Sequence, residues 1–190
     1  MRARFVTPVG ALLLACSLAA CGSSGDAGTF QPAGKPQSAS PAASGSPDAD
    51  SGAAPTGLTT AQIDKQVLAV YRGYQRAYER AYETNDPAGL AFYAMDPLLG
   101  IIAADLRKTA AKGEIWRFHN LVNPRIQGRS KTGATVFVID CLQTLGAYRY
   151  SAKTGKRLGA FRGGAHAYQA IMRYVDGTWK ISNATEGQKC

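Results

Sequence analysis

The sequence predicts an α+β domain in which helices come first and a mostly antiparallel sheet follows. Apolar residues recur at helical spacing from about residue 60 to residue 110, and after residue 113 they change to the spacing of strands. The pair Asp176-Gly177 separates two β-rich segments and is a strong hairpin signal. Segregated helices and hairpin-linked strands indicate α+β rather than alternating α/β architecture.

Three helices are expected before the sheet. Thr59 and Gln62 have the spacing of a capping box, which predicts a first helix of about 24 residues. The sequence Asn85-Asp86-Pro87 ends that helix and starts a short second helix through residue 94. Asp96-Pro97 repeats the start signal for a third helix, and Gly113 is suited to end it.

The strands follow after Gly113. Pro124 within the first extended segment, residues 115 to 126, predicts an edge or a bulge. Gly163-Gly164 is interpreted as a bulge or turn between a weak segment and a longer strand. The other predicted segments are a turn at 128–133, strands at 134–142, 145–150, 157–161, 165–175 and 178–184, and a tight turn at 152–155.

This order of elements resembles the NTF2-like (SnoaL-like) cone, in which a curved sheet wraps around the first helix and leaves a pocket. The resemblance rests also on the Gly177–Ile181 ending and on Asp140-Cys141 before a Lys153–Gly155 turn. These residues look like those of small actinobacterial lipoproteins and secreted proteins of this fold that have no assigned function. The alternative is a cystatin-like or other α+β roll.

The N-terminal residues resemble a bacterial lipoprotein signal peptide. Arg2 and Arg4 precede a short apolar run, and Leu18–Cys21 (LAAC) looks like a lipobox, in which Cys21 receives the lipid. The run is shorter than the roughly 20 apolar residues of a membrane span. An ordinary secretory cleavage site is the alternative. The resemblance implies an extracytoplasmic protein that is anchored by palmitate-type acyl chains to the outer face of the bacterial membrane.

Composition divides the chain into three parts. Residues 1–20 form the signal peptide, and residues 21–57 form a lipidated tether rich in Gly, Ser, Pro and Ala, too polar to order itself. Residues 58–190 form the folded domain, which holds 19 of the 22 lysines and arginines but only 10 of the 13 acids. Its basic surface suits anionic lipid headgroups or wall polymers, unless the charges only maintain solubility. Nucleic acid is not expected as a partner outside the cell.

Two cysteines remain in the folded domain, Cys141 and Cys190. An even number outside the cytoplasm predicts a disulfide, which would contribute roughly 4 kcal/mol in the chain-entropy model. A metal pair or two free thiols are the alternatives. No His lies beside either cysteine, so no metal site and no cofactor are expected.

Three residues are weak candidates for chemistry. Asp140 follows an apolar strand segment, and a buried carboxylate there could act as an acid or base. It could equally face solvent at the strand end. His119 and His166 are the only histidines, and each is expected to line a cavity or to be partly buried in a structural role.

Tyrosines of the first helix form an apolar stripe that is expected to pack into the sheet. The same stripe could form the wall of a ligand pocket. The predicted pocket-lining residues are Tyr74, Tyr78, Tyr82, Trp116 and Tyr168.

Two functions are therefore compared. In the first, the domain is a binding module for a small hydrophobic ligand or for a cell-envelope protein or polymer, with a homodimer as one form. In the second, it is a SnoaL-like isomerase, cyclase or dehydratase that acts on a small hydrophobic substrate. An inward-facing carboxylate or imidazole with a polar partner would favour the enzyme.

Overall fold

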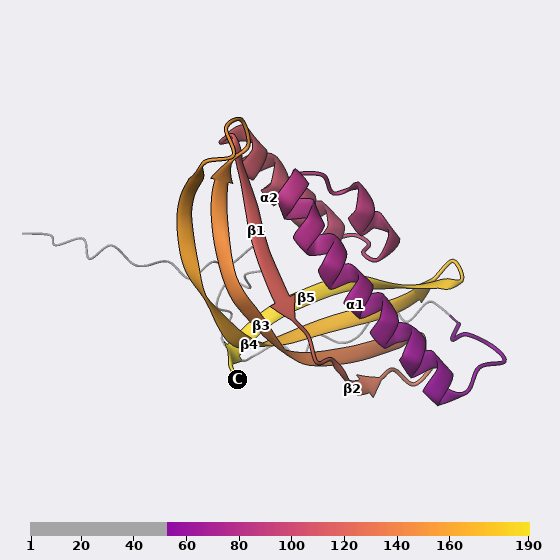
Figure 1. Cartoon of the computed structure of the whole chain (residues 1–190). Coiled ribbons are helices and arrows are strands. Elements are labelled where there is room, and N and C mark those ends of the chain that lie inside the picture. Colours follow the sequence, from indigo (N-terminus) through magenta and orange to yellow (C-terminus); the bar gives the residue numbers. More distant parts are fainter. Residues whose placement is uncertain (1–52) are drawn as a thin grey trace, which may run out of the picture.

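The computed structural model describes residues 53–190, which contain two α-helices, one 3₁₀ helix and a five-stranded sheet (Figure 1). The expectations for the signal peptide, for Cys21 and for the tether up to residue 52 lie outside the described residues. The predicted α+β class is confirmed, with helices followed by a curved antiparallel sheet that wraps around the first helix. The second predicted helix is a single 3₁₀ segment, so two α-helices are present where three helices were expected.

Helix α1 spans Thr60–Thr84 and begins with the predicted capping box. The Thr59 hydroxyl accepts the Gln62 N–H (3.3 Å), and Gln62 Oε1 accepts the Thr59 N–H (2.8 Å). Asn85 ends the helix in the left-handed conformation, with φ at 55°. Because both ends depend on side chains within four residues, the sequence predicts them well.

Two further helical segments follow. The 3₁₀ helix η1 spans Ala88–Phe92, and the Asp86 carboxylate accepts the Ala88 N–H at its start (2.9 Å). Helix α2 spans Leu98–Ala111, and Asp96 accepts the Gly100 N–H in its first turn (3.0 Å). Gly113 then turns the chain into the sheet with a positive φ of 67°.

The sheet has the strand order β1-β3-β4-β5, and β2 pairs with the other end of β3. All described pairings between these strands are antiparallel. The bounds are β1 Glu114–Leu121, β2 Arg125–Arg129, β3 Thr135–Ser151, β4 Arg157–Val175 and β5 Thr178–Lys189. Asp176 and Gly177 both have positive φ and connect β4 to β5, as the hairpin signal predicts.

Of the predicted bulge or turn at Gly163-Gly164, the turn is wrong, because β4 runs through both glycines and the residues on either side keep one register with β3. A side chain at position 163 would place its Cβ only 1.7 Å from the carbonyl oxygen of Thr144. Only glycine fits at position 163, because the backbones of β3 and β4 come too close there for a side chain. Close approach of two backbones is one of the roles that glycine has within strands.

The first extended segment is split where Pro124 was expected to disturb it. Strand β1 ends at Leu121, and β2 begins at Arg125 against a different part of β3. The predicted turn at 128–133 also starts later, because β2 continues through Arg129.

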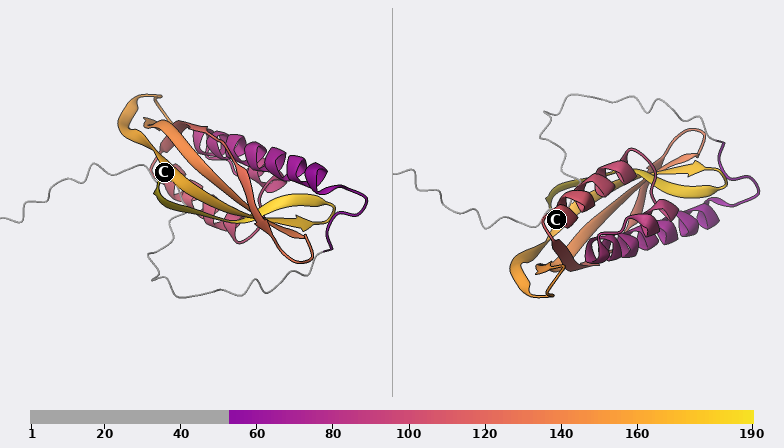
Figure 2. Two further views of the ribbon diagram at one scale, coloured as in Figure 1. Left: turned by 90° about the horizontal axis from the view of Figure 1, so that it is seen from below. Right: turned by 90° about the horizontal axis from the view of Figure 1, so that it is seen from above.

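Both helices lie on the concave side of the curved sheet, with α1 running across it (Figures 1 and 2). No helix of residues 53–190 covers the convex side in these views. None of the described helices is long and apolar enough to cross a membrane.

The hydrophobic core lies between the helices and the concave side of the sheet. Its buried members lie between Val67 and Ala184, and they come from α1, η1, α2, β3, β4 and β5. Ile102, Val136, Met172 and Ile181 are completely buried. Residues 53–190 therefore contain a complete core and all strands of the sheet, so this part of the chain can fold by itself.

Cys141 on β3 and Cys190 at the end of the chain form a disulfide. The bond joins the middle of the sheet to the segment after β5. The backbone N–H of Cys190 also donates to the carbonyl of Ala165 (3.2 Å), so the last residues are attached to β4.

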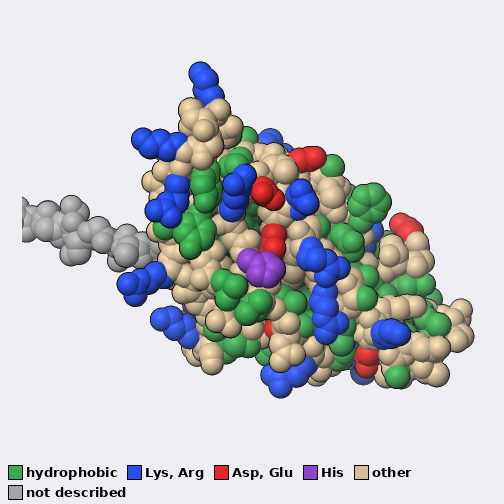
Figure 3. Space-filling view, viewed as in Figure 1, with side chains coloured by type: hydrophobic (Ala, Val, Ile, Leu, Met, Phe, Trp, Pro, Cys, Tyr) green, Lys and Arg blue, Asp and Glu red, His purple; other side chains and the backbone are tan. Residues whose placement is uncertain are grey.

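Basic side chains are unevenly distributed over the surface. In Figure 3, Lys and Arg side chains stand along the upper left edge, where Figure 1 places the β3–β4 hairpin. The sequence explains this, because the segment from Cys141 to Val175 contains six lysines and arginines and no Asp or Glu.

Candidate functional site

Asp140 lies at the centre of the most polar part of the interior. Its side chain is on the concave face of β3 and only 1% exposed, so the alternative that it faces solvent is wrong. Its neighbour in register on β4 is Tyr168. The carboxylate is buried because α1 crosses this point of the sheet and supplies the hydroxyl of Tyr71.

Both carboxylate oxygens of Asp140 accept hydrogen bonds. The Tyr71 hydroxyl donates to Oδ2 (3.0 Å), and the backbone N–H of Asn123 donates to Oδ1 (2.8 Å). Asn123 lies in the break between β1 and β2. Because the chain leaves the sheet there, the Asn123 N–H is free of strand pairing and can donate to the buried carboxylate. These two hydrogen bonds compensate for most of the free energy that desolvation of the carboxylate costs.

A chain of buried amides and hydroxyls extends from Tyr71 away from Asp140. Gln75 Nε2 donates to the Tyr71 hydroxyl (3.2 Å), and Asn120 Nδ2 donates to Gln75 Oε1 (3.3 Å). The Thr144 hydroxyl donates to Asn120 Oδ1 (2.8 Å). We call Asp140, Tyr71, Gln75, Asn120 and Thr144 the polar network.

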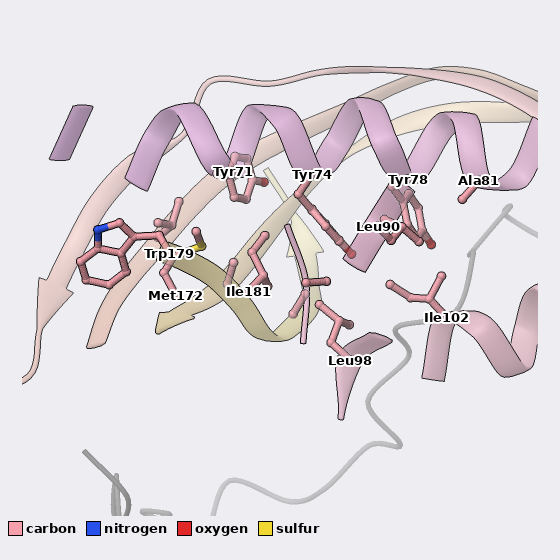
Figure 4. Close-up of a cluster of buried hydrophobic side chains, with 14 of the residues drawn as sticks. Tyr71, Tyr74, Tyr78, Ala81, Leu90, Leu98, Ile102, Met172, Trp179 and Ile181 are labelled. Atoms are coloured by element: carbon pink, nitrogen blue, oxygen red, sulfur yellow. The ribbon is translucent and has the colours of Figure 1, made fainter. Parts of the chain in front are cut away.

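The tyrosine stripe of α1 faces the sheet as predicted (Figure 4). The hydroxyls of Tyr74 and Tyr168 lie 3.4 Å apart, and the rings of Tyr78 and Tyr82 both contact Phe118 of β1. The Tyr82 hydroxyl donates to Asp105 of α2 (2.6 Å). The stripe therefore packs as core, with its hydroxyls satisfied by polar partners.

Burial keeps these phenols in the neutral form. It raises the pKa of Tyr71, and the nearby Asp140 charge raises it further. Burial likewise raises the pKa of Tyr74 and Tyr78 well above the usual value, and it raises the pKa of Tyr168 to about 12. At neutral pH these four groups can donate and accept hydrogen bonds but cannot act as phenolate bases.

Each histidine has a glutamate partner that is distant in the sequence. His166 Nδ1 lies 3.3 Å from Glu186 of β5, and both side chains are about four-fifths buried. His119 Nδ1 lies 3.1 Å from Glu79 of α1, but its side chain is 61% exposed. His166 is therefore part of the interior beside Tyr168, whereas His119 is not.

Trp116 is only partly buried and packs against the edge of the core. Its ring packs against Phe161 of β4 (5.1 Å), and the Arg149 guanidinium lies 5.9 Å from its centre. Glu114 lies 3.6 Å from Arg149. The structure thus brings Tyr74, Tyr78, Tyr82 and Tyr168 together, and Trp116 packs against the same core beside Phe161.

Sequence reasoning missed Gln75, Asn120, Asn123 and Glu186. Gln75 lies one turn after Tyr71, so helical spacing could have identified it. The others are brought to the site only by strand pairing and carry no local signal. In the described part of the chain, no group of three or more His, Cys, Asp and Glu residues could hold a metal ion.

No protein-family model matches the chain, and no curated protein matches it in sequence. Solved structures are similar in fold. The intermembrane-space region of the chloroplast protein ARC6 has a TM-score of 0.57 at 13% identity, and the match covers 66% of this chain and 97% of that one. At this identity the similarity shows the fold alone.

Two other solved structures are similar at lower TM-scores. A protein of the NTF2-like family from Streptomyces avermitilis has 0.44 at 15% identity, over 70% of this chain and 99% of that one. The hexachlorocyclohexane dehydrochlorinase LinA-type3 from Novosphingobium barchaimii LL02 has 0.46 at 12% identity, over 67% and 90%. Neither carries an argument about the activity of this chain.

Proposed function

We propose that this chain is a membrane-anchored lipoprotein whose folded domain is a non-catalytic binding module. The observation that supports it best is the state of Asp140. Its carboxylate is enclosed, and both of its oxygens already accept hydrogen bonds from Tyr71 and Asn123. A general base must come within hydrogen-bond reach of a substrate proton, and this carboxylate is used in holding α1 against the sheet.

The ligand of such a module would be small and largely apolar. Tyr168 and His166 are partly exposed on the concave side, and they lie next to the buried phenols. Aromatic rings with neutral hydroxyls suit a planar or lipidic molecule that has one or two polar atoms. A cell-envelope protein or polymer is the other class of partner that this proposal includes.

The test is native mass spectrometry of residues 53–190, purified from an oxidising compartment. A bound small molecule that survives in the wild type and is lost in Tyr168→Ala supports the proposal. Tyr148→Ala, which changes a tyrosine on the opposite face of the sheet, is the matched control. If both variants keep the molecule, the binding site is not on the concave side.

A second candidate function rests on the His166–Glu186 pair. A carboxylate at Nδ1 of a histidine orients the ring for proton transfer at Nε2, as in other acid–base sites. The enzyme would then use His166, not Asp140, as its base. If the wild type converts the bound molecule to a product of different mass, and His166→Gln does not, the domain is an enzyme and the proposal of a non-catalytic binding module is wrong.

The lipid anchor has its own test. Cells that express the full chain would be fed an alkyne-tagged palmitate. We expect labelling of the wild type and no labelling of Cys21→Ser. Label that persists in Cys21→Ser would reject the anchor, and it would leave the test of the concave side unaffected.

A further inference from the structure

The β3–β4 hairpin carries charge of one sign only. Its segment from Cys141 to Val175 contains six lysines and arginines and no acid. Four of these cations are exposed, namely Lys153, Lys156, Arg157 and Arg162. All ten acidic residues of the segment 58–190 therefore lie outside this part of the hairpin.

A second turn adds to this charge at one end of the molecule. The N–H of Ala152 in the β3–β4 turn donates to the carbonyl of Gly113 in the α2–β1 turn (2.8 Å). The bond places exposed Lys112 beside the hairpin turn. We call Lys112, Lys153, Lys156 and Arg157 the basic tip.

The convex face next to the basic tip continues the same chemistry. Phe118 contacts α1 on the concave side, so alternation directs the neighbouring Arg117 to the other side of the edge strand β1, from which its guanidinium also reaches Glu83 of α1 (3.3 Å). Arg117 is in register with Tyr148, which therefore has the same orientation. The Arg157 guanidinium lies 5.9 Å from the Tyr148 ring, and that of Arg117 lies 5.0 Å from the Tyr150 ring.

Large apolar side chains are exposed on the same hairpin. Leu145 is 56% exposed, Leu158 is 45% exposed and Tyr148 is 40% exposed. These three residues are half of the large hydrophobic side chains that the described part of the chain exposes. Exposed apolar side chains on a charged surface are a feature of sites that contact membranes or other proteins.

We propose that the basic tip and the adjoining convex face bind the surface of an anionic phospholipid membrane. Lysines and arginines would contact the lipid phosphates, while Leu158 and Tyr148 would enter the headgroup layer, where tyrosine is favoured. A soluble polyanion would satisfy the cations but would leave the leucines exposed, so the lipid surface accounts for more of the observations. The concave side would remain free for a ligand.

This inference goes beyond the proposed function, because it requires neither the lipid on Cys21 nor a ligand on the concave side. It is tested with residues 53–190, which contain the complete core and carry no acyl chain. Binding is measured by co-sedimentation with vesicles that contain about one third phosphatidylglycerol, and with vesicles of phosphatidylcholine alone. We expect binding to the anionic vesicles only, with weaker binding as salt is raised.

The main variant is the triple substitution Lys153→Gln, Lys156→Gln, Arg157→Gln. Each cation near an anionic surface contributes about fivefold, so the triple variant should lower the partition constant roughly 100-fold. The matched control is Lys65→Gln, Arg72→Gln, Arg76→Gln, which removes the same charge from the exposed side of α1. It should lower the constant much less. An equal loss in both variants would overturn the proposal, because net charge would then explain the binding.

A third variant distinguishes a lipid surface from an anionic polymer. Leu158→Gln should weaken vesicle binding several-fold and leave binding to soluble polyphosphate unchanged. If Leu158→Gln binds vesicles like the wild type, and polyphosphate binds as tightly as vesicles, the partner is a polymer and the proposal is wrong. Circular dichroism of every variant establishes that the fold is retained.

Discussion

The two halves of the β3–β4 hairpin belong to one antiparallel ladder but differ in burial and in surface charge. In the core half, Val136 and Val138 of β3 lie beside Met172 and Ala170 of β4, and all four are at most 1% exposed. In the tip half, Leu145, Tyr148 and Leu158 are 40% exposed or more. Backbone pairing extends through both halves, with one register shift between Arg149 and Tyr150, so pairing does not decide which half is buried.

The difference comes from what lies against each half. The core half is covered on its concave side by α1, η1 and α2, which supply most of the buried side chains. The tip half carries the exposed cations of the hairpin. One hairpin can therefore supply a core at one end and a charged surface at the other, and its stability should be concentrated in the core half.

The largest effect is expected from the disulfide, which connects the middle of the hairpin to the chain end. Replacing both Cys141 and Cys190 by Ser should lower the free energy of unfolding by roughly 4 kcal/mol, because the unfolded chain regains the freedom of a long loop. Urea unfolding of the oxidised wild type and of the double variant measures this. A free-thiol assay that finds two thiols in the native protein would contradict the disulfide.

Removal of the buried carboxylate comes next. Asp140→Ala should lower the free energy of unfolding by about 3 kcal/mol, because it leaves the Tyr71 hydroxyl and the Asn123 N–H without their acceptor. Asp140→Asn keeps one carbonyl oxygen as an acceptor and should cost less. An Asp140→Ala protein as stable as the wild type would mean that the polar network does not hold α1 to the sheet.

High pH should weaken the core half through its tyrosines. Burial raises the pKa of Tyr168 to about 12, so between the ordinary tyrosine pKa of about 10 and this value the unfolded chain releases a proton that the folded one keeps. The contribution of Tyr168 is complete below pH 10 and is lost as the pH rises toward 12, by about 1.4 kcal/mol per pH unit. Unfolding curves of the wild type and Tyr168→Phe measure it. A Tyr168→Phe protein with the same slope above pH 10 would reject this assignment.

The smallest effect on stability is expected in the tip half. Leu158→Gln and the triple substitution at Lys153, Lys156 and Arg157 should each change the free energy of unfolding by no more than about 0.5 kcal/mol, because these side chains are exposed. Thermal unfolding, monitored by circular dichroism, measures this change for each variant against the wild type. A loss of several kcal/mol in either variant would show that the two halves are equally important for stability.

Several elements of the fold could be predicted from sequence because their causes are local. The capping box of Thr59 and Gln62, the end of α1 at Asn85 and the Asp176-Gly177 turn all depend on neighbours a few residues away. The failure at Gly163-Gly164 has the opposite cause. Those glycines permit contact with Thr144, which lies on another strand, and glycine alone does not tell a turn from a close approach.

The candidate site was less predictable for the same reason. Asp140 was identified, but its partner Tyr71 is 69 residues away, and its other donor Asn123 lies in a break of the sheet. The glutamate at His119 is 40 residues away in sequence. Such pairings depend on register, which one sequence does not reveal.

The sequence by itself determined where the helices begin and end, which turns connect the last strands, and that two cysteines were present to pair. These features follow from propensities and spacings within a few residues. Only the tertiary structure decided that Asp140 is enclosed rather than exposed, that His166 and not His119 faces the interior, and that Lys112 lies beside the cations of the hairpin turn. Burial and charge clustering depend on how the sheet curves around α1, and that curvature results from contacts between residues far apart in the chain.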